Sequence, residues 1–309
     1  MKTRFPGNLG RVFVQFSILT ILAACSNSEK YIVGEGGGPY NMVLFVESRS
    51  WRSGQSLEMV FRLTDSRTGE SVKNLQLAHQ RLMHIFVTNQ TLDYFSHLHV
   101  EKNLENEIGA DGYFSVQHAF NKSGIYRIVV EFVHRNKIWN KSFDVVVGES
   151  EDRSKVPIID SLKNPTYVAE LKRGKKIISG KEVELAIEIN RDGRPIRDLQ
   201  LFLGSELHGA VWREDLENFG HLHSFTPKME NLIREIRTRK NGMRVSPAEL
   251  QEVLVEVMCS DSELVFSGPL VPIRYTFPDP GIYHLFAQVA PAGVPQTFKF
   301  VLNVESVVY

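Results

Sequence analysis

From Tyr40 onward the chain alternates short apolar stretches with polar turn sequences. The stretches "MVLFVES", "SLEMVFRLTD", "MHIFVTN", "YFSVQHAF" and "IYRIVVEFV" are rich in Val, Ile, Phe and Tyr, which is typical of strands. The sequences "SRTGE", "GADG" and "NKSG" between them are typical of turns. Several short strands at this spacing predict an all-β sandwich.

The same order of stretches recurs in the second half of the chain. "SGQSLEMVFRLTDSRTGESVKNLQL" is answered by "SGKEVELAIEINRDGRPIRDLQL", and "FNKSGIYRIVVEF" is answered by "FPDPGIYHLFAQV". Residues 150–164 are charged and then punctuated by Pro, which indicates a linker. We therefore expect two homologous β-sandwich domains in tandem, domain 1 at 39–149 and domain 2 at 165–306.

Domain 2 carries about thirty additional residues after the stretch "FGHLH" at Phe219–His223. Ser246 suits a helix N-cap and Pro247 suits the first helical turn. One apolar stripe contains Leu250, Val253, Leu254 and Val257. The pattern predicts a helical insertion at about 228–262. Two interpretations stay open: a lid or docking surface for a protein partner, and a loop expansion packed on the sandwich.

The N-terminus has the features of a lipoprotein signal peptide. Basic residues precede the apolar run Val12–Ala24, which is shorter than the ~20 residues of a membrane-spanning helix. The run ends in "LAAC", which resembles a bacterial lipobox. We expect a signal peptide at 1–24, lipidation of Cys25 and a flexible, Gly-rich tether at 25–38.

The residue after the lipidated cysteine indicates where the protein is anchored. Ser26, rather than Asp, follows Cys25. By analogy with Gram-negative lipoproteins, this predicts a cell-envelope protein on the outer membrane that faces the periplasm, with the membrane as partner through the lipid.

Charge and cysteine content narrow the function classes. Lys plus Arg and Asp plus Glu number 36 each, and loss of Lys2, Arg4 and Arg11 with the signal peptide changes the net charge from 0 to −3. A chain without a basic block argues against nucleic acid as a partner. Cys259 is then the one unmodified cysteine, so no internal disulfide forms, and it is either a buried small residue or a reactive thiol.

Six of the ten histidines follow one rule, His-x12-His-x-His. Residues i and i+2 of a strand point to the same face, so the two rings of each His-Leu-His motif converge. The sequences "TNQTLDY" and "WREDLEN" look like hairpin turns that fold the first histidine back beside the pair. Such a tripod suits copper or zinc, and we expect one ion in each domain. The proposed ligands are His84, His97 and His99 in domain 1 and His208, His221 and His223 in domain 2.

The alternative is that these histidines belong to an apolar core. Their same-face neighbours on the same predicted strands include Phe86, Phe95, Trp212 and Phe219. A buried neutral histidine is then bonded to a carbonyl or carboxylate, and Asp93 and Glu217 stand at matching positions as second-shell candidates.

Catalytic motifs are scarce. The sequence has no Gly-x-Ser-x-Gly elbow, no phosphate-binding Gly loop and no His-Glu-x-x-His helix. We expect that the protein is not an enzyme and keep a metal-dependent enzyme as a third interpretation.

The segments "NLQL…MH…D..F.HLH…DG.F…F..SGIYR" and "DLQL…LH…E..F.HLH…PGIYHLFAQ" resemble secreted and periplasmic bacterial β-sandwich modules of the YtkA-like kind and, more distantly, CopC-type copper carriers. The resemblance implies an immunoglobulin- or cupredoxin-like sandwich and periplasmic handling of copper or another heavy metal. CopC-type proteins use a histidine at the mature N-terminus, where this chain has Cys25, so that ligand does not carry over. In domain 2 the insertion and "GPLVPIRY" replace the "DG.F" signature.

Two functional hypotheses follow from these patterns. The first is a lipid-anchored cell-envelope protein that binds divalent metal, copper before zinc, for storage, delivery or resistance. The second is a structural or interaction lipoprotein whose histidines are structural and whose insertion docks a protein partner.

Overall fold

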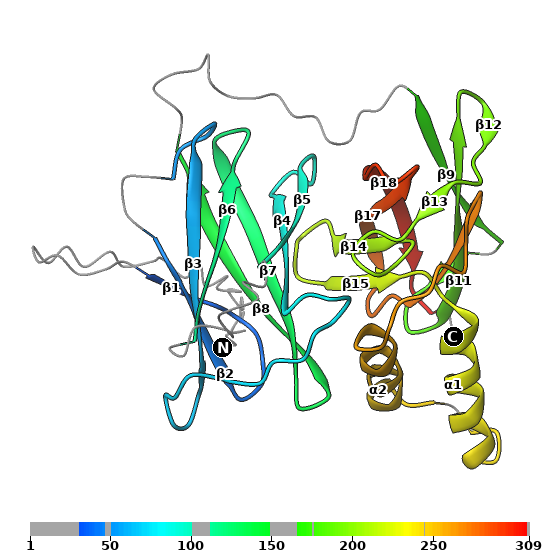
Figure 1. The fold of residues 1–309 in the computed structure, drawn as a ribbon, viewed down its shortest axis with the longest axis horizontal. Coiled ribbons are helices and arrows are strands. Elements are labelled where there is room, and N and C mark those ends of the chain that lie inside the picture. Colours follow the sequence, from blue (N-terminus) through cyan, green and yellow to red (C-terminus); the bar gives the residue numbers. More distant parts are fainter. Residues whose placement is uncertain are drawn as a thin grey trace, which may run out of the picture.

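The computed structural model describes residues 31–46, 51–100, 112–148, 166–174, 176–243 and 245–307. It contains two β-sandwiches side by side, with two helices on the second (Figure 1). The predicted all-β fold with a helical insertion is therefore confirmed. The signal peptide at 1–24, Cys25 and the linker at 150–164 lie outside the described residues. Within the described part of the chain, neither helix has the length and apolar character needed to cross a bilayer.

Domain 1 packs two four-stranded sheets face to face. The first has the order β1-β2-β3-β6 and the second the order β5-β4-β7-β8. Alternate residues of both sheets fill the core between them, with Met42, Phe61 and Ile128 fully buried. The strands are β1 (Tyr31–Val33), β2 (Tyr40–Phe45), β3 (Ser56–Asp65), β4 (Met83–Asn89), β5 (Phe95–His99), β6 (Tyr113–Ala119), β7 (Gly124–His134) and β8 (Lys137–Val147).

Part of the expected tether belongs to this sandwich. β1 pairs antiparallel with β2, and Glu35 forms a bridge with Ser142 on β8. At Gly38, φ is +96°, and a Cβ would stand 2.3 Å from the Trp139 ring. The Gly-rich sequence that predicted flexibility thus allows close backbone packing, and the prediction of a flexible tether is wrong for residues 31–38.

Domain 2 repeats the two-sheet arrangement. One sheet has the order β12-β11-β16, with β9 also paired to β11, and the other has the order β10-β18-β17-β14-β15, with β13 paired to β17. Ile187, Ile273 and Leu285 lie in the core between the sheets. The strands are β9 (Tyr167–Arg173), β10 (Ile177–Ile178), β11 (Glu182–Arg191), β12 (Arg194–Pro195), β13 (Leu199–Gln200), β14 (His208–Arg213), β15 (Phe219–His223), β16 (Leu270–Thr276), β17 (Gly281–Pro291) and β18 (Gln296–Glu305).

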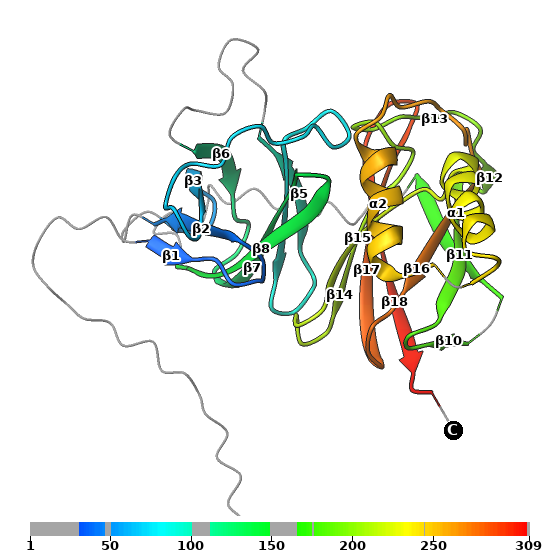
Figure 2. The same ribbon diagram turned by 90° about the horizontal axis from the view of Figure 1, so that it is seen from below.

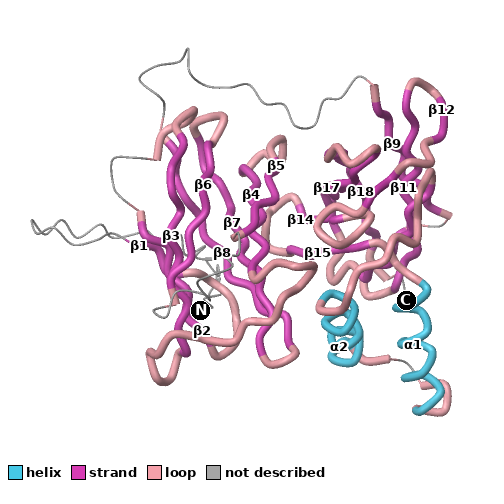
Figure 3. The backbone as a smooth tube through the Cα atoms, in the orientation of Figure 1, coloured by secondary structure: helices cyan, strands magenta, loops and turns pink. Residues whose placement is uncertain are grey.

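The insertion forms two helices, α1 (Pro227–Arg239) and α2 (Pro247–Met258). Ser246 caps α2, as predicted, in a capping box with Glu249. The two helices stand beside domain 2, and α2 is the nearer to domain 1 (Figure 3). Val255 and Met258 of α2 pack against apolar residues of domain 1, and Gln251 Nε2 donates to the Ile138 carbonyl at 3.1 Å. The insertion thus forms part of the contact between the two domains.

The hairpins β4–β5 and β14–β15 bring the two sandwiches together (Figure 2). Their outer faces share a separate apolar cluster, in which the Phe95 and Phe286 rings stack with centroids 4.8 Å apart. Reciprocal contacts flank it: Arg127 of domain 1 donates to the Leu216 carbonyl, and Lys299 of domain 2 donates to the Leu92 carbonyl. The cluster consists of Phe86, Leu92, Phe95, Val129, Ala210, Trp212, Leu216 and Phe286.

Candidate metal centre

In domain 1 the strand register opposes His84 to a histidine and to a carboxyl group. His84 on β4 lies directly opposite His99 on β5 and opposite Glu131 on β7. Side chains at such opposed positions share one face of the sheet. The hairpin therefore gathers the first trio as the sequence predicts, and the neighbouring strand β7 adds an acidic residue.

Domain 2 reproduces this register with one change. His208 on β14 lies opposite His223 on β15 and opposite Gln288 on β17. Gln288 follows Gly281 by seven residues, as Glu131 follows Gly124. The duplicated site thus has a carboxylic acid in one copy and an amide in the other.

The two faces point at one another across the domain interface. The His84 and His221 ring centroids are 5.3 Å apart, and those of His97 and His208 are 5.4 Å apart. One ring nitrogen from each of these four histidines lies within 4.8 Å of the other three. The sequence predicts a separate cluster in each domain, whereas the structure merges the two clusters into one. The merged cluster contains His79, His84, His97, His99, His208, His221 and His223.

Hydrogen bonds orient the His84 ring. Its Nε2 lies 3.1 Å from the Ala78 carbonyl oxygen, which only accepts, so the proton is on Nε2. The unprotonated Nδ1 then faces the cluster. It stands 3.1 Å from His97 Nε2 and 3.2 Å from His99 Nε2.

Each domain also orients a ring of the other. His97 Nδ1 donates to Gln288 Oε1 at 3.1 Å, and His221 Nδ1 donates to Glu131 Oε1 at 2.7 Å. The Gln288 amide is itself held, because its Nε2 donates to Thr297 Oγ1 at 3.1 Å. Both rings therefore turn an unprotonated Nε2 toward the cluster. An outer partner that fixes tautomer and orientation is usual for metal-binding histidines.

This arrangement brings unshared electron pairs together. His84 Nδ1 and His97 Nε2 both lack a proton and are 3.1 Å apart. His99 has one N–H to donate to His84, which leaves the lone pair of His97 unmatched. Two nitrogens bound to one tetrahedral ion at ~2.0–2.1 Å stand about 3.4 Å apart, so a cation between the rings turns the repulsion into attraction.

Other ring nitrogens of the cluster have no partner. A buried polar atom left this way is rare in a native structure and often indicates a bound ion or water. In the cluster, six ring nitrogens are buried without a hydrogen bond of good geometry: His79 Nδ1 and Nε2, His208 Nδ1 and Nε2, His221 Nε2 and His223 Nε2.

Burial keeps the rings neutral. Burial first, and the neighbouring rings to a smaller extent, lower the pKa of His79 to about 4 and the pKa of His84 to about 3. Nearby backbone carbonyls favour the protonated rings of His79 and His208, but desolvation outweighs them. Neutral imidazole is the form that binds metal. For the same reason, the pKa values of His97, His208, His221 and His223 lie well below 6.5.

Glu131 is the carboxyl group that contacts the cluster. Its side chain is 6% exposed, and burial raises its pKa to about 8. In the metal-free protein at neutral pH the group is therefore largely protonated, and its carbonyl oxygen accepts from His221. A positive ion bound to His221 would favour the ionised carboxylate.

The two second-shell candidates from the sequence lie elsewhere. Asp93 is at the tip of the β4–β5 hairpin, where it pairs with Asn89 and Lys122. Glu217 is exposed in the matching turn, and its backbone N–H donates to Asp215. Both residues are in the turns, whereas the rings lie along the strands, so the prediction that they partner the histidines is wrong.

Three residues of the site escaped the sequence analysis: His79, Glu131 and Gln288. A signal for the last two exists, because a polar residue interrupts the apolar strands "IYRIVVEFV" and "IYHLFAQV" at the same position. His79 has no counterpart in domain 2, so the repeat gives no signal for it.

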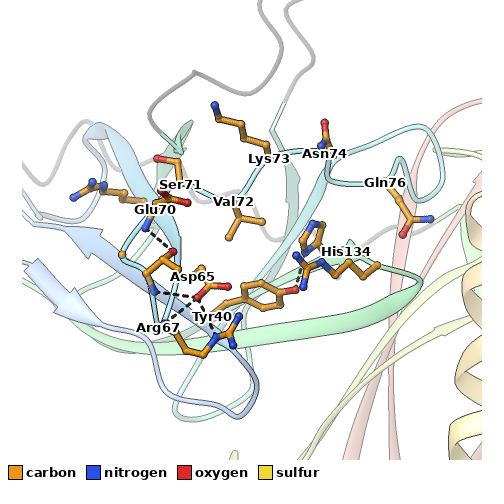
Figure 4. Close-up of a pocket in the computed structure, with 14 residues that line it drawn as sticks. Tyr40, Asp65, Arg67, Glu70, Ser71, Val72, Lys73, Asn74, Gln76 and His134 are labelled. Atoms are coloured by element: carbon orange, nitrogen blue, oxygen red, sulfur yellow. Dashed lines mark hydrogen bonds and ion pairs between the residues drawn. The ribbon is translucent and has the colours of Figure 1, made fainter.

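A separate polar cavity of about 930 Å³ lies on domain 1 (Figure 4). Tyr40 and His134 line it, with the hydroxyl oxygen 2.6 Å from His134 Nδ1, and Asp65 accepts from backbone N–H groups at its rim. None of its lining residues belongs to the histidine cluster.

Comparison with known proteins gives a family but no activity. A family model with the description "Domain of unknown function (DUF8832)" matches residues 40–149 and 163–306. No curated protein matches the chain. A Salmonella alpha-2-macroglobulin mutant matches at 11% identity with a TM-score of 0.27, and red sea bream transglutaminase at 6% with 0.23. Each match covers 87% of this chain, which spans only 17% and 32% of those proteins. Similarity at these TM-scores indicates neither a shared fold nor a shared function.

Proposed function

The chain belongs to the family described as Domain of unknown function (DUF8832), and we propose that it is a metal-binding protein whose divalent ion sits between its two domains. One observation carries the proposal. Ring nitrogens of His84 and His97 from domain 1 and of His208 and His221 from domain 2 lie within 4.8 Å of one another. Four neutral imidazoles in this space match the coordination number of zinc and suit copper.

The orientation of the rings adds support. Three of these histidines donate their outer N–H to a carbonyl, amide or carboxyl oxygen, at 3.1, 3.1 and 2.7 Å. Their inner nitrogens are thereby fixed as acceptors that face a common space. A histidine in an ordinary core needs one such hydrogen bond, but it does not need a neighbouring lone pair aimed at its other nitrogen.

Copper ranks before zinc in this proposal. Nitrogen ligands bind Cu²⁺ more tightly than Zn²⁺ in the usual order of divalent affinities. Geometry and metal supply decide the outcome in a cell, and four imidazoles accept both ions. We propose storage, delivery or resistance as the role, on the outer membrane facing the periplasm, where the lipobox at Cys25 would anchor the chain.

The position of the cluster suggests how an ion enters and leaves. β5 and β15, which contain His97, His99, His221 and His223, are edge strands of their sheets. An ion reaching the cluster along these edges would join ligands from both domains. Separation of the domains would then split the ligand set, which suits delivery to a partner.

The rival hypothesis, an interaction lipoprotein, gains no specific support. The insertion expected to dock a partner uses Val255 and Met258 of α2 to pack against domain 1. The insertion thus contributes to the domain interface, and any partner would bind its remaining surface. A pull-down that depends on residues 228–262 would favour this rival.

Metal titration tests the proposal. Purified mature protein, freed of metal, is titrated with Cu²⁺ and Zn²⁺, desalted and analysed for retained ion. The variant His97→Ala/His99→Ala/His221→Ala/His223→Ala should retain none, while the control His134→Ala, outside the cluster, should bind like the natural protein. Equal metal content in all three proteins would overturn the proposal.

A further inference from the structure

His79 is the ring that the histidine motifs do not explain. It precedes β4, and its backbone has a φ of 46°, in the left-handed region that few non-glycine residues adopt. The backbone N–H of His79 donates to the Met258 carbonyl at the end of α2, at 2.6 Å. On its other side lies Gly204, with a φ of +82°, where a Cβ would stand 3.4 Å from His79 Cα. The insertion and a domain 2 turn therefore fix this residue against the cluster.

The His79 ring meets two rings of domain 2. Its centroid is 4.1 Å from that of His223 and 5.2 Å from that of His208, and the latter two are 5.0 Å apart. His79 is 4% exposed and His208 is 1% exposed. Both nitrogens of each, and Nε2 of His223, are buried without a hydrogen bond of good geometry, although the Gly204 and Phe202 carbonyls lie near His79 and His208. Each neutral ring has one unprotonated nitrogen, so the three rings in mutual contact offer three ligand atoms.

The opposite end of the cluster already has enough ligands for one ion. His84 Nδ1 lies within 3.1 and 3.2 Å of Nε2 of His97 and His99, close to the about 3.4 Å expected around a tetrahedral ion. His221 contacts the His84 ring at 5.3 Å and has an unmatched Nε2, which supplies a fourth nitrogen. Seven ring ligands exceed what one four-coordinate ion uses.

We propose that the cluster binds two metal ions side by side: the first on His84, His97, His221 and His99, which takes the place of His208, and the second on His79, His208 and His223. This inference rests on the proposed function and adds a second site with a ligand that the repeat does not predict. Each ion takes ligands from both domains. Three protein ligands leave one position of the second ion open to water or an exogenous ligand.

The charges predict the order of filling. Two divalent ions in one buried cluster repel each other, and Glu131 is the carboxyl group in contact with it, through His221. That contact favours the first site, which contains His221. The second ion should therefore bind more weakly, in a separate step.

Native mass spectrometry of the full mature chain, titrated with Zn²⁺, measures the stoichiometry. We expect two ions, bound in two steps, for the natural protein. The variant His79→Ala/His223→Ala should stop at one ion, and His134→Ala should bind two. Electron paramagnetic resonance of the Cu²⁺-loaded natural protein should show two mutually broadened ions, and the double variant should show one isolated ion.

The outcomes separate the inference from the function on which it rests. Saturation of the natural protein at one ion with an isolated Cu²⁺ spectrum, or two ions in the double variant, would overturn the two-ion centre and leave metal binding intact. No retained ion in the natural protein would overturn both. The measurements on the natural protein decide the matter even if the double variant does not fold.

Discussion

Glu131 of domain 1 accepts a hydrogen bond from His221 of domain 2 at 2.7 Å, and both side chains are almost fully buried. The equivalent contact in the other direction joins His97 of domain 1 to Gln288 of domain 2 at 3.1 Å. Each domain therefore orients a histidine of its neighbour, with a carboxyl group on one side and an amide on the other. This asymmetry supplies a matched pair of variants.

Glu131→Gln should weaken metal binding. The amide keeps a hydrogen-bond acceptor for His221 but removes the negative charge that strengthens the ring as a ligand. Loss of such an outer partner lowers metal affinity by about 10–100-fold. A competition titration against a chromophoric chelator measures the change, and an affinity equal to that of the natural protein would argue against His221 as a ligand.

Gln288→Glu should have the opposite effect. It creates a second carboxyl group beside His97, and the affinity for the first ion should rise, measured by the same titration. The variant is the mirror of Glu131→Gln, since the two positions are equivalent in the repeat. A fall in affinity would mean that His97 acts through something other than its orienting partner.

Metal binding should release about one proton per protein at pH 7. The rings release none because burial already keeps them neutral, with the pKa of His79 lowered to about 4. The proton comes from Glu131, whose pKa burial raises to about 8. Calorimetry in two buffers of different ionisation enthalpy counts it. Glu131→Gln should release none, and unchanged release in that variant would place the proton elsewhere.

The metal-free protein should lose stability as pH falls from 6.5 toward 4. The folded-state pKa of His79 is lowered to about 4 and that of His84 to about 3, from 6.5 when unfolded, so in this window the unfolded chain binds the extra protons. Glu131 works against this between pH 4.5 and about 8, because there the folded state holds its proton. Glu131 is a single group, whereas seven histidines of the cluster have a lowered pKa. The net effect of lowering the pH is therefore loss of stability.

Urea unfolding of metal-free protein at pH 7.0 and pH 5.0 measures this dependence. The midpoint should be lower at pH 5.0, and the difference should shrink when cluster histidines are replaced. A midpoint that is equal or higher at pH 5.0 would mean that the rings are not buried in the neutral form.

The apolar cluster at the interface should control metal affinity from a distance. Trp212 is fully buried there between Phe95, Phe219 and Phe286. Trp212→Ala should cost about 3–5 kcal/mol of unfolding free energy and loosen the docking of the domains, which weakens metal binding. The control Trp139→Ala alters the core of domain 1 beside Tyr40 rather than the shared apolar cluster. It should leave metal affinity unchanged, and equal losses in both variants would contradict a shared centre.

The sequence predicts the parts of the site better than their assembly. Apolar alternation and the repeat predict the two sandwiches, and the His-x12-His-x-His spacing correctly predicts that His84 and His208 fold back beside the pair in their own domain. These are local consequences of strand period and hairpin length.

Docking between the domains follows from no local pattern. The sequence pattern around Phe86 and Trp212 fits core residues of separate sandwiches equally well, but both residues line the domain interface. Whether a polar residue in an apolar strand faces solvent or another domain depends on that docking. The roles of Glu131 and Gln288 could therefore not be predicted from the sequence. His79 lies in an unrepeated turn held by α2, where no periodicity applies.

Anomalous diffraction from crystals of the metal-loaded protein, recorded at the absorption edge of the ion, tests the shared centre most directly. We predict a peak within ~2.0–2.1 Å of Nε2 of both His97 and His221, one ring from each domain. A peak whose ligands all come from a single domain, or no peak at the cluster, would contradict it.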